Sequence, residues 1–210
     1  MLTPTVPAVM LLDRILAGAT RIARWGALAG GTLLLAGALL VACDVLLRKL
    51  AGRSIGGADE LSGYSFAIGT AWAFAFVLLE RGNVRVDALY QHLPAMAARV
   101  LDVLALLALG AFALTVATYG WTVVAQSVRL AARSNSALSV PLALPQALWW
   151  GGWAFFVLVI VLLLLRVVAA AIGGDGATMA RLAGARSTAE EAREEFDNAR
   201  AAAGLRGDLP

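Results

Sequence analysis

The sequence contains one histidine, His92, and one cysteine, Cys43, among 210 residues. A membrane anchor that binds haem b needs a pair of histidines on facing helices, so this chain cannot ligate that cofactor by itself. A single cysteine also excludes a disulfide within the chain, and no zinc site is indicated. We therefore expect neither a cofactor nor a metal.

Charged residues are also scarce, at 15% of the chain, and they are missing from the middle of every long apolar run. Soluble domains contain about 25% charged residues. A proton-coupled exporter usually needs a carboxylate deep in a span. The sequence shows no P-loop, no paired catalytic carboxylates, and no nucleophile with a usable base. These absences argue against an enzyme and favour a scaffold or accessory subunit.

What the sequence does contain is apolar residues, which make up 60% of it. About 20 apolar residues in a helix cross the roughly 30 Å hydrocarbon core of a bilayer. The expected fold is an all-α membrane protein, with a four-helix transmembrane domain over residues 25–172 and spans at about 25–47, 61–79, 100–125 and 146–172. The net charge of +3 fits loop topology and anionic lipid better than nucleic acid.

Two further segments flank this domain. Within residues 1–24, the stretch from Val9 to Arg24 places leucine and isoleucine on one helical side and three arginines on the other. This pattern predicts an amphipathic helix, lying at the membrane interface or packed on the protein itself. In the tail, residues 173–210, the capping-box pattern of Ser187–Glu190 predicts a short charged helix on the cytosolic side.

The polar segments supply three groups of candidate site residues. Asp44 and Arg48 lie four residues apart at the end of the first span, so they can pair on one helix face. The structural turn between the second and third spans contains Arg81, Gly82, Asn83, Arg85 and Asp87. The other two loops carry five cations: Arg48, Lys49, Arg53, Arg129 and Arg133.

An even number of spans puts both termini on one side of the membrane, together with the turn that contains Arg85. This side has nine nearby cations, against five on the other side. The positive-inside rule therefore predicts that both termini and the turn are cytoplasmic. The bias is modest, because five cations are many for an outer face. These five either contact lipid headgroups or meet acidic patches on a partner.

Short motifs around the second span carry a resemblance. They are Gly57-Ala58-Asp59-Glu60-Leu61 before the span, Arg81-Gly82-Asn83-Val84-Arg85-Val86-Asp87 after it, and then Leu93-Pro94. Over roughly residues 20–170 the chain resembles the small membrane subunit, of the DctQ type, of tripartite ATP-independent periplasmic (TRAP) transporters. In that family an acidic residue and a leucine open the second span, and a GHIRVD-like motif and an LP pair follow. Asn83 stands where the family usually has histidine.

The resemblance implies a partner and a role. In that family the small subunit pairs with a large multi-span subunit that carries sodium and substrate. A soluble periplasmic binding protein delivers an organic acid. We therefore expect a non-enzymatic, multi-pass protein of the bacterial inner membrane that scaffolds the large subunit and helps to dock the binding protein. The alternative is a membrane anchor that docks a redox or signalling enzyme through the turn and the tail.

Overall fold

The computed structural model describes residues 7–82, 94–176, 178, 195–196 and 199–200. These residues contain four long α-helices: α1 (Pro7–Ala51), α2 (Ala58–Leu79), α4 (Ala95–Arg129) and α5 (Ala143–Ile172). Each is long and apolar enough to cross a membrane. The prediction of an all-α protein with four spans is therefore confirmed. The capping-box segment of the tail lies outside the described residues.

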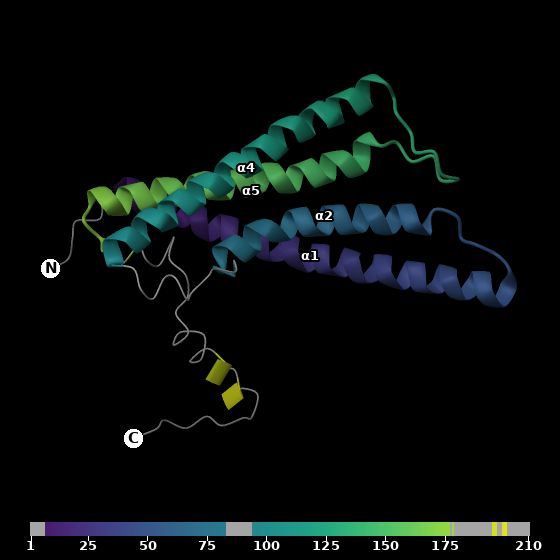
Figure 1. Cartoon of the computed structure of the whole chain (residues 1–210), viewed down its shortest axis with the longest axis horizontal. Helices are drawn as coiled ribbons and strands as arrows, with labels where there is room; N and C mark the ends of the chain where they lie inside the picture. Colours follow the sequence, from purple (N-terminus) through teal and green to yellow (C-terminus); the bar gives the residue numbers. More distant parts are fainter. Residues whose placement is uncertain (1–6, 83–93, 177, 179–194, 197–198, 201–210) are drawn as a thin grey trace.

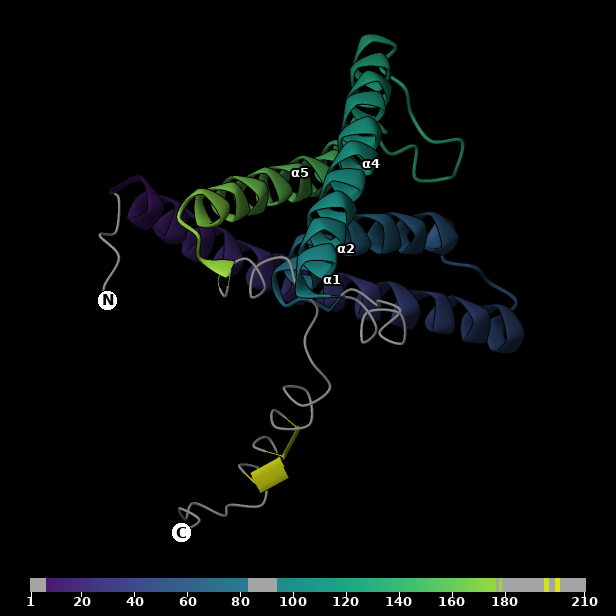
Figure 2. The same ribbon diagram turned by 60° about the vertical axis from the view of Figure 1, so that its left-hand side comes forward.

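The helices form two antiparallel pairs that are joined through α5. In Figure 1, α1 lies beside α2, and α4 lies beside α5. Helix α5 also packs on α2 and α1, whereas α4 packs mainly on α5. Figure 2 shows from a second side that α1 and α2 lie side by side. Helix α5 is therefore the central helix of the bundle, and α4 is the outermost one.

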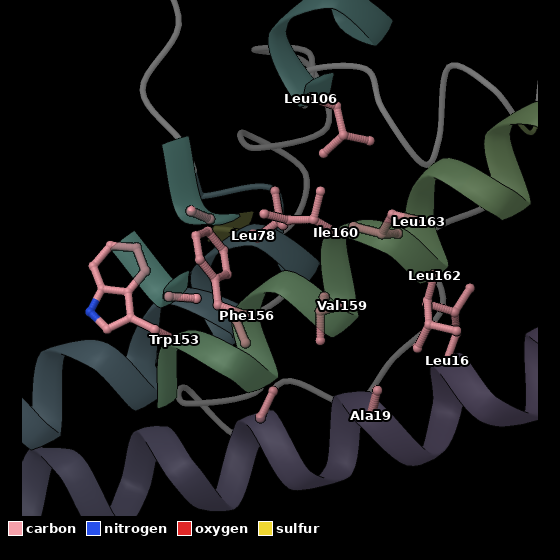
Figure 3. Close-up of a cluster of buried hydrophobic side chains, with 14 of the residues drawn as sticks. Leu16, Ala19, Leu78, Leu106, Trp153, Phe156, Val159, Ile160, Leu162 and Leu163 are labelled. Carbon is pink, nitrogen blue, oxygen red and sulfur yellow. The ribbon is translucent and has the colours of Figure 1, made fainter. Parts of the chain in front are cut away.

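The core lies where α5 meets the other three helices (Figure 3). Val159 and Ile160 of α5 are almost completely buried, and Leu16 of α1, Leu78 of α2 and Leu106 of α4 pack in the same cluster. Many large apolar side chains instead point outward along all four helices, among them Leu28, Leu35, Phe66, Phe112, Leu114 and Val168. Soluble monomers rarely expose so much contiguous apolar surface, so the environment that suits these faces is lipid or another membrane helix.

The α1–α2 pair is held together by a close approach of two backbones. A Cβ added to Gly30 would lie only 2.7 Å from the carbonyl oxygen of Gly69, and one added to Gly69 would lie 2.8 Å from that of Gly30. Gly37 likewise faces Ser62 and Ser65, whereas a Cβ on Gly31 would meet open space. Small residues let membrane helices pack at such short distances. Gly26, Gly30 and Gly37 of α1 therefore face α2, whereas Gly31 does not.

Helix α1 is one continuous helix of 45 residues. At 1.5 Å per residue it is about 68 Å long, roughly twice the thickness of a hydrocarbon core. Its uncharged stretch between Arg24 and Asp44 alone measures about 30 Å. The segment expected as an amphipathic helix therefore runs directly into the first span. Leu16 and Ala19 of that segment are buried in the core, while Leu11 and Ile15 are exposed. Its contact with the membrane interface remains a prediction.

Candidate partner-binding surface

Two short loops meet at one end of the bundle, which we call the loop end. Residues 52–57 connect α1 to α2, and residues 130–142 connect α4 to α5. Gly57 packs so tightly against Leu138 that a Cβ at this position would clash, and its φ of 88° is one that glycine adopts readily. The contact between Gly57 and Leu138 therefore joins the loop of the α1–α2 pair to the loop of the α4–α5 pair. Every candidate cation in the two loops therefore lies at the same end of the molecule.

Asp44 anchors the first of these loops. Its carboxylate accepts hydrogen bonds from the Ser54 hydroxyl at 2.9 Å and from the backbone N–H of Ile55 at 2.6 Å. It also pairs with the Arg48 guanidinium at 2.7 Å. Asp44 is only 2% exposed, although it lies within two turns of the end of α1. The structure thus brings the predicted boundary pair together and adds two loop donors that the i, i+4 spacing does not reveal.

Glu60 has a similar position at the start of α2. The Tyr64 hydroxyl, one turn later on the same helix, donates a hydrogen bond to Glu60 Oε1. The hydroxyls of Ser136 and Ser134, from the 130–142 loop, lie beside the same carboxylate. Oε2 is buried and accepts no hydrogen bond of good geometry from the described residues. Glu60 therefore faces the second loop rather than open solvent.

The 130–142 loop has an ordered backbone of its own. The N–H of Ser134 bonds to the carbonyl of Val140 at 2.9 Å, and the N–H of Leu142 bonds to that of Ala132 at 3.0 Å. The Arg133 guanidinium donates to the carbonyl of Ser139 at 2.9 Å across the loop. These bonds give the loop a hairpin-like shape. A defined shape suits a surface that has to meet a partner in one orientation.

All five cations predicted for partner docking are exposed at the loop end. Arg48 is engaged with Asp44, and Arg133 with the carbonyl of Ser139. Lys49, Arg53 and Arg129 have no ion-pair or hydrogen-bond partner among the described residues. The structure therefore separates the five into two that stabilise local structure and three that are available to an acidic partner.

The predicted turn between the second and third spans is only partly described. Arg81 and Gly82 end α2 in a tight turn, in which the N–H of Arg81 bonds to the carbonyl of Leu78 at 3.1 Å. Arg81 has a φ of 55°, in the left-handed region. Asn83, Arg85 and Asp87 lie outside the described residues. Their role as a structural hinge remains a prediction.

One ion pair joins two helices and is not predicted by the sequence. Arg166 of α5 donates through Nε to Asp13 of α1 at 2.6 Å. The Arg166 side chain is 14% exposed, so Asp13 supplies the negative charge that this cation needs near its apolar surroundings. The two residues are 153 positions apart, and no periodicity connects them. In the sequence, Asp13 is the one acidic residue in a segment with three arginines, and nothing marks it as the partner of Arg166.

Two indole N–H groups also bridge helices. Trp72 of α2 donates to the carbonyl of Leu148 at 3.0 Å, and Trp150 of α5 donates to the carbonyl of Ala117 at 2.8 Å. These bonds join α2 and α4 to the same part of α5. The described residues contain no cluster of histidine, cysteine, aspartate and glutamate that could bind a metal ion.

Comparison with known proteins agrees with the resemblance found in the sequence. Searches among curated proteins and among solved structures found no match. The family model of the DctQ component of tripartite ATP-independent periplasmic transporters matches residues 37–170, which is more than half of the chain. The matched region begins on α1 and includes both loops of the loop end, α2, α4 and nearly all of α5. The chain therefore belongs to the DctQ family, which identifies it as the small membrane subunit of a TRAP transporter.

Proposed function

We propose that this subunit is a fixed membrane scaffold for a large transport subunit, in a sodium-driven system that takes up an organic acid across the bacterial inner membrane. The observation that carries the scaffold role is the lack of charge inside the described spans. Residues 25–43, 61–79, 103–128 and 143–165 contain no Asp, Glu, Lys, Arg or His. Ion and substrate pathways in membranes usually need ionisable groups at such depths. Coupling chemistry is therefore assigned to the large subunit.

We propose that the loop end faces the periplasm and that both termini face the cytoplasm. The excess of cations near the termini supports this orientation. In a Cys43→Ser background, single cysteines at Arg53 and at Arg85 report the two sides. An impermeant maleimide added to intact cells should label the cysteine at position 53. The cysteine at position 85 should be labelled only after the cells are permeabilised. Labelling at position 85 but not at position 53 would show that the proposed orientation is wrong.

We propose that Lys49, Arg53 and Arg129 help to dock the periplasmic binding protein. Exposed charge pairs contribute only about 0.2–1 kcal/mol each, but complementary patches speed encounter and make it dependent on salt. Combining Arg53→Glu with Arg129→Glu should raise the binding-protein concentration for half-maximal transport by roughly ten-fold at low ionic strength, with two charges reversed. The maximal rate should change less.

The measurement is transport by the assembled complex in proteoliposomes, with binding protein titrated at low and high salt. A matched control reverses two exposed cations at the opposite end, Arg14 and Arg24. That control should leave the titration unchanged. If the control and the loop-end variant shift the titration equally, the effect is one of net charge, and the docking assignment is wrong.

A further inference from the structure

A groove opens on the outer face of the α1–α2 pair. Its volume is about 450 Å³, and its walls are almost entirely apolar. Gly26 and Gly30 line it on the α1 side, and Trp72 lines it on the α2 side. The principal lining residues are Arg21, Trp25, Ala29 and Leu33 of α1 and Ile68 and Trp72 of α2. Only one of these side chains, that of Arg21, carries a charge.

The position of the groove along the helices limits what can fill it. Gly30 of α1 faces Gly69, and Gly26 faces Trp72, so Arg21 lies near the level where α2 ends at Leu79. From Arg21 to Leu33 the groove measures about 18 Å along α1, at 1.5 Å per residue. Half of a hydrocarbon core is about 15 Å. The groove therefore covers one leaflet, which suits an acyl chain better than a partner helix that crosses both leaflets.

The positive charge of Arg21, at one end of the groove, indicates that the ligand also has an anionic headgroup. Arg166 is neutralised by Asp13 and Arg48 by Asp44, but Arg21 has no acidic partner among the described residues. A guanidinium matches the geometry of a phosphate group with two parallel hydrogen bonds. Trp25, next to Arg21 along the groove, is 72% exposed, as an indole at headgroup level would be.

We propose that this groove is a binding site for an anionic phospholipid of the leaflet at the Arg21 end. One acyl chain lies along Ala29 and Leu33, against Trp72, and the phosphate pairs with Arg21. The site concerns the lipid surroundings of the subunit, and it does not depend on which partner or substrate the transporter has. An acyl chain in this position would fill the groove without opening the α1–α2 contact.

The test is native mass spectrometry of the purified full-length chain, titrated with phosphatidylglycerol or with phosphatidylethanolamine. Arg21→Gln should weaken phosphatidylglycerol binding by about five-fold, the effect of one cation at a lipid surface. Its matched control is Arg24→Gln, a neighbouring exposed arginine that does not line the groove. Ala29→Phe should fill the groove and weaken binding of both lipids. Ala36→Phe, at an exposed position two turns further along α1 and outside the groove, should leave binding unchanged.

Each alternative outcome is visible in the same data. Equal losses for the two arginine variants would mean that the lipid responds to general charge, and the proposed phosphate site would be wrong. Unchanged binding in Ala29→Phe, with the thermal midpoint retained, would remove the groove as the site of the acyl chain. Release of the bound lipid when the large subunit is added would assign the groove to that subunit and overturn the proposal.

Discussion

Replacing Gly30 with alanine should destabilise the protein, whereas the same replacement at Gly31, the next residue, should not. The new Cβ at position 30 would lie 2.7 Å from the Gly69 carbonyl oxygen and 2.9 Å from the Gly69 Cα, and both are backbone atoms that no rotamer change can move. The two backbones must then move apart at this contact. Overpacking of this kind costs about 1–3 kcal/mol, and it falls on the most extensive helix–helix contact among the described residues.

The thermal midpoint in detergent, followed by circular dichroism, measures this difference. For a chain of this size a loss of that magnitude lowers Tm by roughly 2–12 °C. Gly31→Ala meets nothing within 4 Å and gains helix propensity of up to about 1 kcal/mol, so its Tm should stay the same or rise. Equal Tm values for the two variants would show that the close approach of α1 and α2 does not contribute to stability.

Asp44→Asn should lower the stability of the loop end while leaving the helices formed. The substitution keeps the size of the side chain but removes the charge that pairs with Arg48 and strengthens the bonds from Ser54 and Ile55. Hydrogen bonds to a charged acceptor are worth more than neutral ones, and the loss should lower Tm by roughly 5 °C. Proteolysis within residues 52–57 should also become faster, because the loop loses its anchor.

Asp59→Asn is the matched control for this prediction. Asp59 is an exposed acid at the same end of the molecule and at the start of α2. Removing its charge forfeits only a weak interaction with the helix dipole. Its Tm and its rate of proteolysis should remain close to those of the unmodified protein. A loop that is equally resistant to protease in both variants would mean that Asp44 does not hold it in place.

Much of the architecture was readable from hydropathy and local spacing. Four apolar runs of membrane length predicted four helices, because a spanning helix must satisfy its own backbone hydrogen bonds. The spacing of Asp44 and Arg48 predicted their contact, since residues four apart share a helix face. Spacing does not distinguish Gly30, which faces α2, from Gly31, which faces away, because that difference depends on how α1 is turned toward α2.

The interactions between distant elements were not readable in this way. Asp13 and Arg166 lie 153 residues apart, and their pairing depends on the angle at which α1 crosses α5. The position of Glu60 beside Ser136 depends on how two loops meet. Neither geometry leaves a periodic pattern in the sequence. The positions of the two loops between apolar runs predicted a set of five cations at the loop end. The division into engaged and available residues follows from the loop fold.

The dependence of α4 on α5 has a consequence for the order in which the protein is made. Chains emerge from the ribosome from the N-terminus, and segments begin to associate during synthesis. Helices α1 and α2 are adjacent in the sequence and pack on each other, so they can associate as soon as both are in the bilayer. Helix α4 packs mainly on α5, which is synthesised last of the four. During translation α4 is therefore surrounded by lipid until α5 has been inserted. Insertion of α5 then completes the bundle in a single late step.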